Sequence, residues 1–247
     1  MDLDQAFEER LQEIDAYLSL LEALERQVRT GPPVIGGAPI TAQQQKILYS
    51  SVYLQLYNLV EATVTWCIDA VVAASCDGGK WKPADLGEKM HREWVRIMAR
   101  THTDMSPGTR LDTAVAFCTK IIESKPIEQW SIERGGGGNW DVHAIQDMTE
   151  RIGCDVQLSN ATLKAVKRFV KDDMGPIELV KSLRNQLAHG SISFEQCGEG
   201  VTSSDLKAIR DVTDAYLREV IRAFRSFIDN HHFIVQHKRP GVPGGGL

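Results

Sequence analysis

The sequence predicts an all-α protein, built as an up-and-down bundle of helices with a long N-terminal helix and irregular loops. Apolar residues recur at steps of three and four over several long segments, which is the spacing of one face of an α-helix. Runs that alternate apolar and polar residues, as strands do, are almost absent, and no repeat period is present. The 247 residues are enough for one large domain or two small ones.

The first helix is expected over residues 3–29, followed by a Pro- and Gly-rich break. Its apolar residues form one narrow stripe, which suits a coiled-coil seam or a helix that faces a core. The segment 30–39 contains three prolines and cannot continue the helix. We therefore expect an amphipathic helix within 1–30 and a linker over 31–40. The stripe consists of Phe7, Leu11, Ile14, Leu18, Leu21, Leu24 and Val28.

The next helix is expected over residues 42–74, with Thr41 as its N-cap. Its apolar residues lie on more than one side, which is typical of a central helix in a bundle or of one at an oligomer interface. Glu61 is the acidic residue at its middle.

Shorter helices and loops are expected in the middle of the chain. The helices are predicted over 84–101, 109–123, 141–152 and 159–171, and Gly153 closes the third of them. The segment 130–141 contains four consecutive glycines, Gly135 to Gly138, and predicts an irregular loop.

The last third of the chain predicts two helices. One covers residues 175–189, with Pro176 in its first turn, an inner stripe of leucines and β-branched residues, and Gly190 as its stop. The Ser191–Phe194 stretch is expected to be extended. The final helix covers about 204–230, and the Gly- and Pro-rich segment 231–247 is expected to be a flexible tail. The helical domain is thus expected over 41–230.

Composition excludes several classes of protein. Hydrophobic residues make up 43% and charged residues 25%, as in a soluble globular protein. The net charge of −5 gives no global attraction to nucleic acid or to an anionic membrane. The acidic N-terminus is unlike a signal peptide, and no uninterrupted apolar run reaches the ~20 residues of a membrane span, so we expect a cytoplasmic protein without a membrane partner.

The cysteines, histidines and glycines predict no metal or cofactor site. The five cysteines are widely spaced and form no C-x-x-C pair; Cys67 and Cys118 fit buried positions on helices. The seven histidines form no H-E-x-x-H motif. A phosphate-binding loop would need Lys-Ser or Lys-Thr after the glycine run, where the chain has Asn139 and Trp140. We expect no cofactor and no bound metal.

The stretch SLRNQLAHG, residues 182–190, is the candidate for chemistry. On a helix, Asn185 and His189 share a face, and Arg184 is long enough to reach the same groove. An imidazole near its usual pKa can give or take a proton at neutral pH. A guanidinium can hold a phosphate and stabilise the charge that builds on it. These groups fit cleavage of an RNA phosphodiester to a 2′,3′-cyclic phosphate, although a helix end with a polar cap has the same spacing.

Arg184, Asn185 and His189 in this order resemble the R-N-x-x-x-H form of the motif of the HEPN superfamily (higher eukaryotes and prokaryotes nucleotide-binding). The motif lies on the penultimate long helix, and Gly190 after the histidine also fits the family. Glu61 stands in an early apolar helix, where many members carry a polar residue that faces the site. The segments around residues 135–141 and 151–155 are similar to those of a subgroup found beside bacterial defence and toxin–antitoxin genes. The resemblance covers about residues 45–230.

The resemblance implies a HEPN-like bundle that dimerises, with the two motif helices meeting in one cleft. It implies a metal-independent endoribonuclease that acts as a toxin or in antiviral defence, with RNA as substrate and an antitoxin or defence protein as a possible partner. His189 would then transfer protons, Arg184 would bind phosphate, and Asn185 would orient groups or stabilise the transition state. Glu61 is the weaker candidate, because Thr65 stands where some members carry a basic residue, and it would hold Arg184.

Two alternatives remain at this point. The chain can be a non-catalytic HEPN module that binds a nucleotide or a partner protein, with the N-terminal helix as its interaction arm. It can also be a structural helical protein in which His189 is a cap. Because the net charge is acidic, RNA binding would need a partner or a local basic patch such as Lys164, Lys167, Arg168, Lys171 and Lys181.

Overall fold

The structure is a computed structural model that describes residues 2–101, 103–134 and 139–240, and it confirms the all-α fold class. The four glycines of the expected irregular loop lie outside these residues. The described chain forms two compact units. The first comprises residues 1–63, 139–143 and 158–219, and the second comprises the remaining residues.

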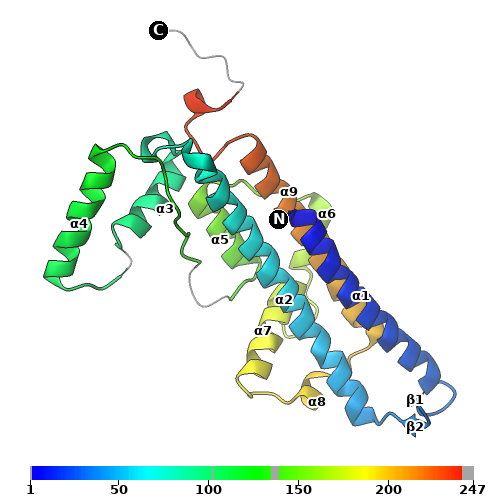
Figure 1. The fold of residues 1–247 in the computed structure, drawn as a ribbon. Helices are drawn as coiled ribbons and strands as arrows, with labels where there is room; N and C mark the ends of the chain where they lie inside the picture. Colours follow the sequence, from blue (N-terminus) through cyan, green and yellow to red (C-terminus); the bar gives the residue numbers. More distant parts are fainter. Residues whose placement is uncertain (1, 102, 135–138, 241–247) are drawn as a thin grey trace. The chain divides into compact units, whose positions relative to one another are not determined.

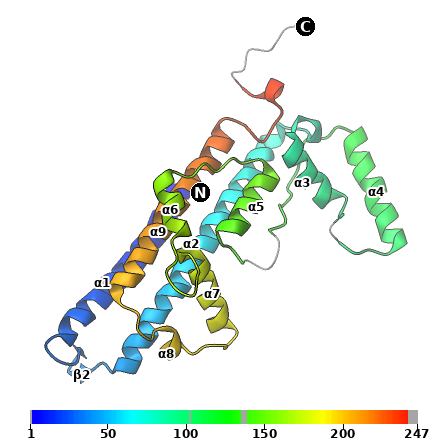
Figure 2. The same cartoon turned by 180° about the vertical axis from the view of Figure 1, so that it is seen from behind.

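The first unit is built on three long helices (Figures 1 and 2). They are α1 (Leu3–Val28), the first part of α2 (Ala42–Ser75) and most of α9 (Ser203–Asp229). The predicted stripe of α1 is buried from Phe7 to Leu24, so α1 is part of the core of this unit and not an interaction arm. Val28, the last residue of that stripe, is exposed.

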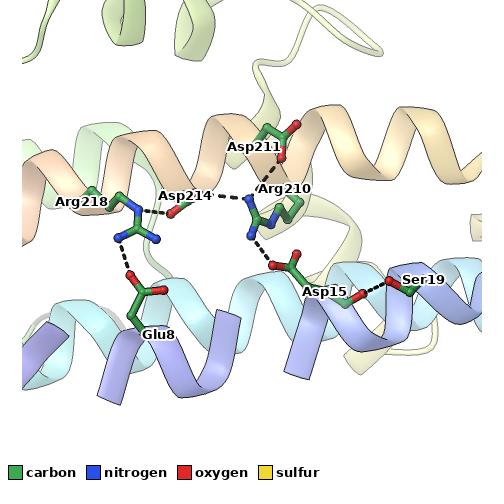
Figure 3. Close-up of polar contacts among 7 residues, drawn as sticks. All are labelled: Glu8, Asp15, Ser19, Arg210, Asp211, Asp214 and Arg218. Atoms are coloured by element: carbon green, nitrogen blue, oxygen red, sulfur yellow. Dashed lines mark hydrogen bonds and ion pairs between the residues drawn. The ribbon is translucent and has the colours of Figure 1, made fainter. Parts of the chain in front are cut away.

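Ion pairs join α1 to α9 along one side of this core (Figure 3). Arg210 of α9 binds Asp15 of α1 and also contacts Asp211 and Asp214, each at 3.2 Å. One turn further along the chain from Asp214, Arg218 binds Glu8 of α1 and Asp214. The two arginines therefore hold α1 and α9 in register while Leu206, Ile209 and Leu217 fill the interior.

Three short helices complete the first unit. They are α6 (Asn160–Lys167), α7 (Pro176–Ala188) and α8 (Phe194–Cys197). The stretch expected to be extended thus begins a helix at Phe194, because Ser193 and Gln196 form a capping box. The expected linker contains a two-stranded antiparallel hairpin, β1 (Val34–Ile35) and β2 (Ala38–Pro39).

The second unit is formed by the end of α2, by the end of α9 and by the segments between them. Its helices include α3 (Glu88–Met98), α4 (Pro107–Ile122) and α5 (Val142–Ile152), with 3-10 turns at Asp77–Gly79, Pro83–Asp85 and Gln236–Lys238. Aromatic side chains fill its core, and the indole of Trp130 donates a hydrogen bond to Ser75 at 2.9 Å. Phe233 and Ile234, in the expected flexible tail, are buried.

The helices α2 and α4 are both rich in apolar residues but differ in how far these residues are buried. The stretch Ala42–Gly79, which contains α2, is long and apolar enough to cross a membrane by length and composition, with a mean hydropathy of 1.5 over 18 residues. Its residues Leu56, Val60 and Ile68 are fully buried, as in the core helix of a soluble protein. α4 instead exposes its apolar residues, and Cys118, expected to be buried, is exposed, whereas Cys67 is buried as predicted.

Candidate active site

The candidate site is built on α7, whose position is fixed by its apolar stripe. Ile177, Val180, Leu183 and Leu187 are buried, as the sequence predicts. The helix ends at Gly190, which has a φ of 70°. The N–H groups of Gly190 and Ser191 donate to the carbonyls of Leu187 and Gln186, which satisfies the last turn.

Arg184 is held by three groups on the side of α7 that faces α2. Its Nη2 donates to Glu61 at 3.0 Å and its Nη1 to Asn185 at 2.8 Å. Its guanidinium carbon lies 3.8 Å from the centre of the Tyr57 ring, within the range of a cation–π contact. The sequence-based pairing of Glu61 with Arg184 is therefore present, and Tyr57 is a third member that the sequence analysis missed.

Asn185 is held in turn by the segment that follows the glycine run. Its Nδ2 donates to Asn139 Oδ1 at 2.9 Å. The next residue, Trp140, is buried, and its N–H donates to the Tyr57 hydroxyl at 3.1 Å. Asp141 accepts a hydrogen bond from Lys181 on α7, so Lys181 is paired and does not belong to an open basic patch.

His189 occupies the C-cap of α7 and is exposed. Its backbone N–H donates to the backbone carbonyl of Asn185. Its imidazole makes no hydrogen bond or ion pair with any residue that the structure describes. The structure thus brings Arg184, Asn185 and Glu61 together, while His189 lies at the end of the same helix without a direct contact to Arg184.

An open cavity of ≈ 350 Å³ lies beside Arg184. Volumes of this size are typical of small-ligand sites. One wall carries polar groups of Asn58, Glu61 and Arg184, and the other is apolar. The apolar side comes mainly from Leu54, Leu187, Ala188 and the partly exposed Phe194.

Burial sets the protonation state of Tyr57. Burial raises the pKa of its hydroxyl, and this outweighs the Trp140 hydrogen bond and the charge of Arg184, which both lower that pKa. The phenol is therefore neutral at physiological pH and accepts the Trp140 N–H without carrying charge. Within the described part of the chain, Arg184 donates one N–H to Glu61 and one to Asn185, which leaves three of its five N–H groups for an incoming anion.

A family model matches residues 1–233, which is nearly the whole chain, and its description is HEPN_MAE_28990-like HEPN. The chain belongs to this HEPN family. No curated protein and no solved structure matches it. Membership makes the chain a nucleotide-binding or ribonuclease-like helical module, since HEPN families include ribonucleases.

Among the residues that the structure describes, no group of three or more His, Cys, Asp or Glu side chains is arranged to hold a metal ion. The signal that could have revealed Tyr57 is its spacing, since it lies four residues before Glu61 and therefore on the same face of α2.

Proposed function

We propose that this HEPN protein is a metal-independent endoribonuclease that cleaves RNA to a 2′,3′-cyclic phosphate and a 5′-hydroxyl. The observation that supports this most directly is Arg184, fixed by Glu61, Asn185 and Tyr57 at the edge of an open cavity with donors left over. A guanidinium held in this way is preorganised to bind a phosphate and the charge that develops on it.

The reaction uses the groups at the end of α7. A base removes the proton from the ribose 2′-OH, O2′ attacks phosphorus, and the bond from phosphorus to O5′ breaks. An acid then protonates the departing O5′, so one proton is taken up and one is released. His189 is the proton-transfer residue in this proposal, because its imidazole is exposed at the end of α7 and an imidazole can both accept and donate a proton. Arg184 binds the phosphate and Asn185 donates to its oxygens.

Glu61 acts on Arg184 and not on the RNA. Its carboxylate fixes the position of the guanidinium before substrate arrives. The carboxylate is 42% exposed, so water screens the ion pair and a phosphate can compete for the same guanidinium. Glu61 is therefore a positioning residue in this proposal.

The test is cleavage of total RNA by the full chain in EDTA. We expect the wild type to produce 2′,3′-cyclic phosphate ends, and His189→Ala and Arg184→Ala to lower the rate at least ~100-fold, as removal of a general acid–base or a charge-stabilising group does. Gln186→Ala is the matched control, because the side-chain amide of Gln186 donates its hydrogen bond to Ser182 on the same helix. Wild-type rates in the folded His189 and Arg184 variants would contradict the assignment.

The second candidate function is a non-catalytic module that binds a nucleotide or a partner protein. The observation that favours it is the separation of Arg184 from His189 within one chain, where no direct contact joins the two side chains. This candidate predicts no cleavage by the wild type, together with nucleotide binding that Arg184→Ala weakens and His189→Ala does not.

The biological setting is part of the same proposal. We place the enzyme in toxin–antitoxin or anti-phage defence, as a homodimer in the cytoplasm, with an antitoxin or defence protein as its regulator. All five cysteines are free thiols, which suits a reducing compartment.

A further inference from the structure

The connection between α6 and α7 exposes an aromatic ring among positive charges. Phe169 is 69% exposed, the largest fraction of any phenylalanine that the structure describes. Four cations stand close to it in the chain, and all are exposed. We call this group the Phe169 patch; it consists of Lys164, Lys167, Arg168, Phe169 and Lys171.

The loop that carries the ring has a defined conformation. The N–H of Val170 donates to the carbonyl of Met174 at 2.9 Å, and the N–H of Met174 donates to the carbonyl of Lys171 at 2.9 Å. At the base of the loop, Gly175 lies close to Val166. A Cβ added to Gly175 would stand 2.3 Å from the Val166 carbonyl oxygen. Asp172 and Asp173 form the tip with φ values of 50° and 56°. Phe169 is therefore exposed on a turn that has a defined conformation.

The charges of the patch are available to a ligand. Lys164, Lys167, Arg168 and Lys171 make no side-chain hydrogen bond or ion pair with another residue in the described part of the chain. Asp172 and Asp173 at the tip reduce the local charge, but four cations against two acids still leave the segment positive in a chain of net charge −5. Exposed cations beside an exposed aromatic ring are the two components of a single-strand nucleic-acid surface.

The patch is at the opposite end of α7 from His189. α7 begins at Pro176, directly after the loop, and its 13 residues span about 20 Å at 1.5 Å per residue. Lys171 also lies close enough to Cys197 of α8 for its charge to lower the pKa of that thiol, although burial has the larger effect and raises it. Phe194 of α8 lines the cavity beside Arg184. A strand of a few nucleotides is long enough to cover the length of α7 between them.

We propose that the Phe169 patch binds the single-stranded RNA that flanks the cleaved bond. The four cations neutralise backbone phosphates, and the Phe169 ring stacks on one base. Because stacking accepts every base, the patch supplies affinity and a path for the strand without reading its sequence. This inference rests on the proposed ribonuclease function.

RNA fits the patch better than a membrane surface does. A membrane-binding segment needs a broad apolar face that enters the lipid together with the basic residues. Here the exposed apolar side chains are few: Phe169 at 69%, its neighbour Val170 at 47% and Leu163 of α6 at 37%. The charged residues stand on α6 and on the turn, so they surround the ring and do not form one polar face opposite an apolar one.

The test measures binding without cleavage. The full chain carrying His189→Ala is titrated with a fluorescein-labelled, mixed-sequence RNA of about 12 nucleotides, within the span that single-strand sites cover. Adding Phe169→Ala is expected to weaken binding about 5- to 100-fold, and Phe169→Trp is expected to restore it. Adding Lys167→Gln with Arg168→Gln is expected to reduce the slope of log affinity against log salt by ~1.4. Lys207→Gln, an exposed lysine on α9, is the matched control.

The outcomes separate this inference from the proposed function. Unchanged RNA affinity in both the Phe169 and the double variant, with circular dichroism showing a folded chain, would overturn the inference even if the wild type cleaves RNA. Lost RNA affinity in a protein that never cleaves would support the patch and overturn the ribonuclease. Vesicles of phosphatidylglycerol and phosphatidylcholine form a second arm. If the same variants abolish vesicle binding and leave RNA binding intact, the surface belongs to a membrane and the inference fails.

Discussion

At the scale of single residues, Tyr57 does two separable things. Its ring lies under the Arg184 guanidinium, and its hydroxyl accepts the N–H of the buried Trp140. The ring helps to hold the Arg184 guanidinium, whereas the hydroxyl ties the segment after the glycine run to α2. Substitutions that remove one function at a time distinguish the two.

We expect Tyr57→Phe to lower the free energy of unfolding by about 1–3 kcal/mol, because the Trp140 N–H loses its partner, and to leave the rate of RNA cleavage close to that of the wild type. Tyr57→Leu is expected to lower kcat as well, since Arg184 loses the ring beneath it. Thermal unfolding and single-turnover cleavage measure the two effects. Equal loss of cleavage in both variants would show that the ring does not position Arg184.

The contacts between site residues that are far apart in the chain could not be predicted from the sequence. The identities of Arg184, Asn185 and Glu61 were predicted, but Asn139 is 46 positions from Asn185 and was passed over as part of a loop. Local spacing fixes which side chains share a helix face, whereas contacts across long separations depend on how the helices pack. Tyr57 and Asn139 became visible only when α2, α7 and the segment after the glycines were placed together.

At the scale of elements, most helices were predictable because their signals are local. Thr41 caps α2 through the N–H of Gln44, and Gly153 and Gly190 end α5 and α7 with positive φ. The helix at Phe194 was missed although its capping box, Ser193 with Gln196, is present in the sequence. α4 shows the limit of periodicity, because its pattern predicts a buried face that the structure leaves exposed.

The contact between α1 and α9 is expected to depend on pH. The hydrogen bond from Arg218 is the main cause that lowers the pKa of Glu8 below its ordinary value of 4.5. A carboxylate whose pKa is lower in the folded state contributes stability above its unfolded pKa, and this contribution is lost as the pH falls through the folded pKa. Glu8 is 40% exposed, so the effect is small.

We therefore expect Glu8→Gln to lower the melting temperature by about 1–2 °C at pH 7, and this difference to shrink as the pH falls through the folded pKa of Glu8, where the wild type loses the same charge. Glu9→Gln is the control, because Glu9 bonds only to Gln5 on the exposed side of α1. Melting curves followed by circular dichroism across this pH range supply the comparison. A difference that stays constant as Glu8 is protonated would mean that the Arg218 pair does not stabilise the fold.

At the scale of the whole molecule, charge is distributed unevenly, and this bears on the proposed RNA binding by an acidic protein. The net charge is −5, and Arg210 and Arg218 pair with four of the acids on α1 and α9, namely Glu8, Asp15, Asp211 and Asp214. The cations of the Phe169 patch have no such partners among the described residues. A local basic surface is sufficient for binding because screening limits the reach of distant charges to about 10 Å.

The separation of Arg184 from His189 leads to a prediction about the assembly. Within one chain, Arg184 is turned toward Glu61 and Tyr57, while His189 stands free at the helix end. We therefore expect that, in a homodimer, a phosphate bound by Arg184 of one copy meets His189 on α7 of the other copy. We expect the active species to be a dimer in which the two residues act from different copies.

Mixing inactive variants tests this arrangement directly. An equimolar mixture of His189→Ala and Arg184→Ala chains, denatured and refolded together, forms mixed dimers that contain one intact His189 and one intact Arg184 on different copies. We expect the mixture to regain cleavage that neither variant shows alone, and sedimentation to give a dimer at the assay concentration. Activity that stays absent in mixed dimers, or a wild type that cleaves RNA as a monomer, would place both residues in a single-chain site and exclude the shared one.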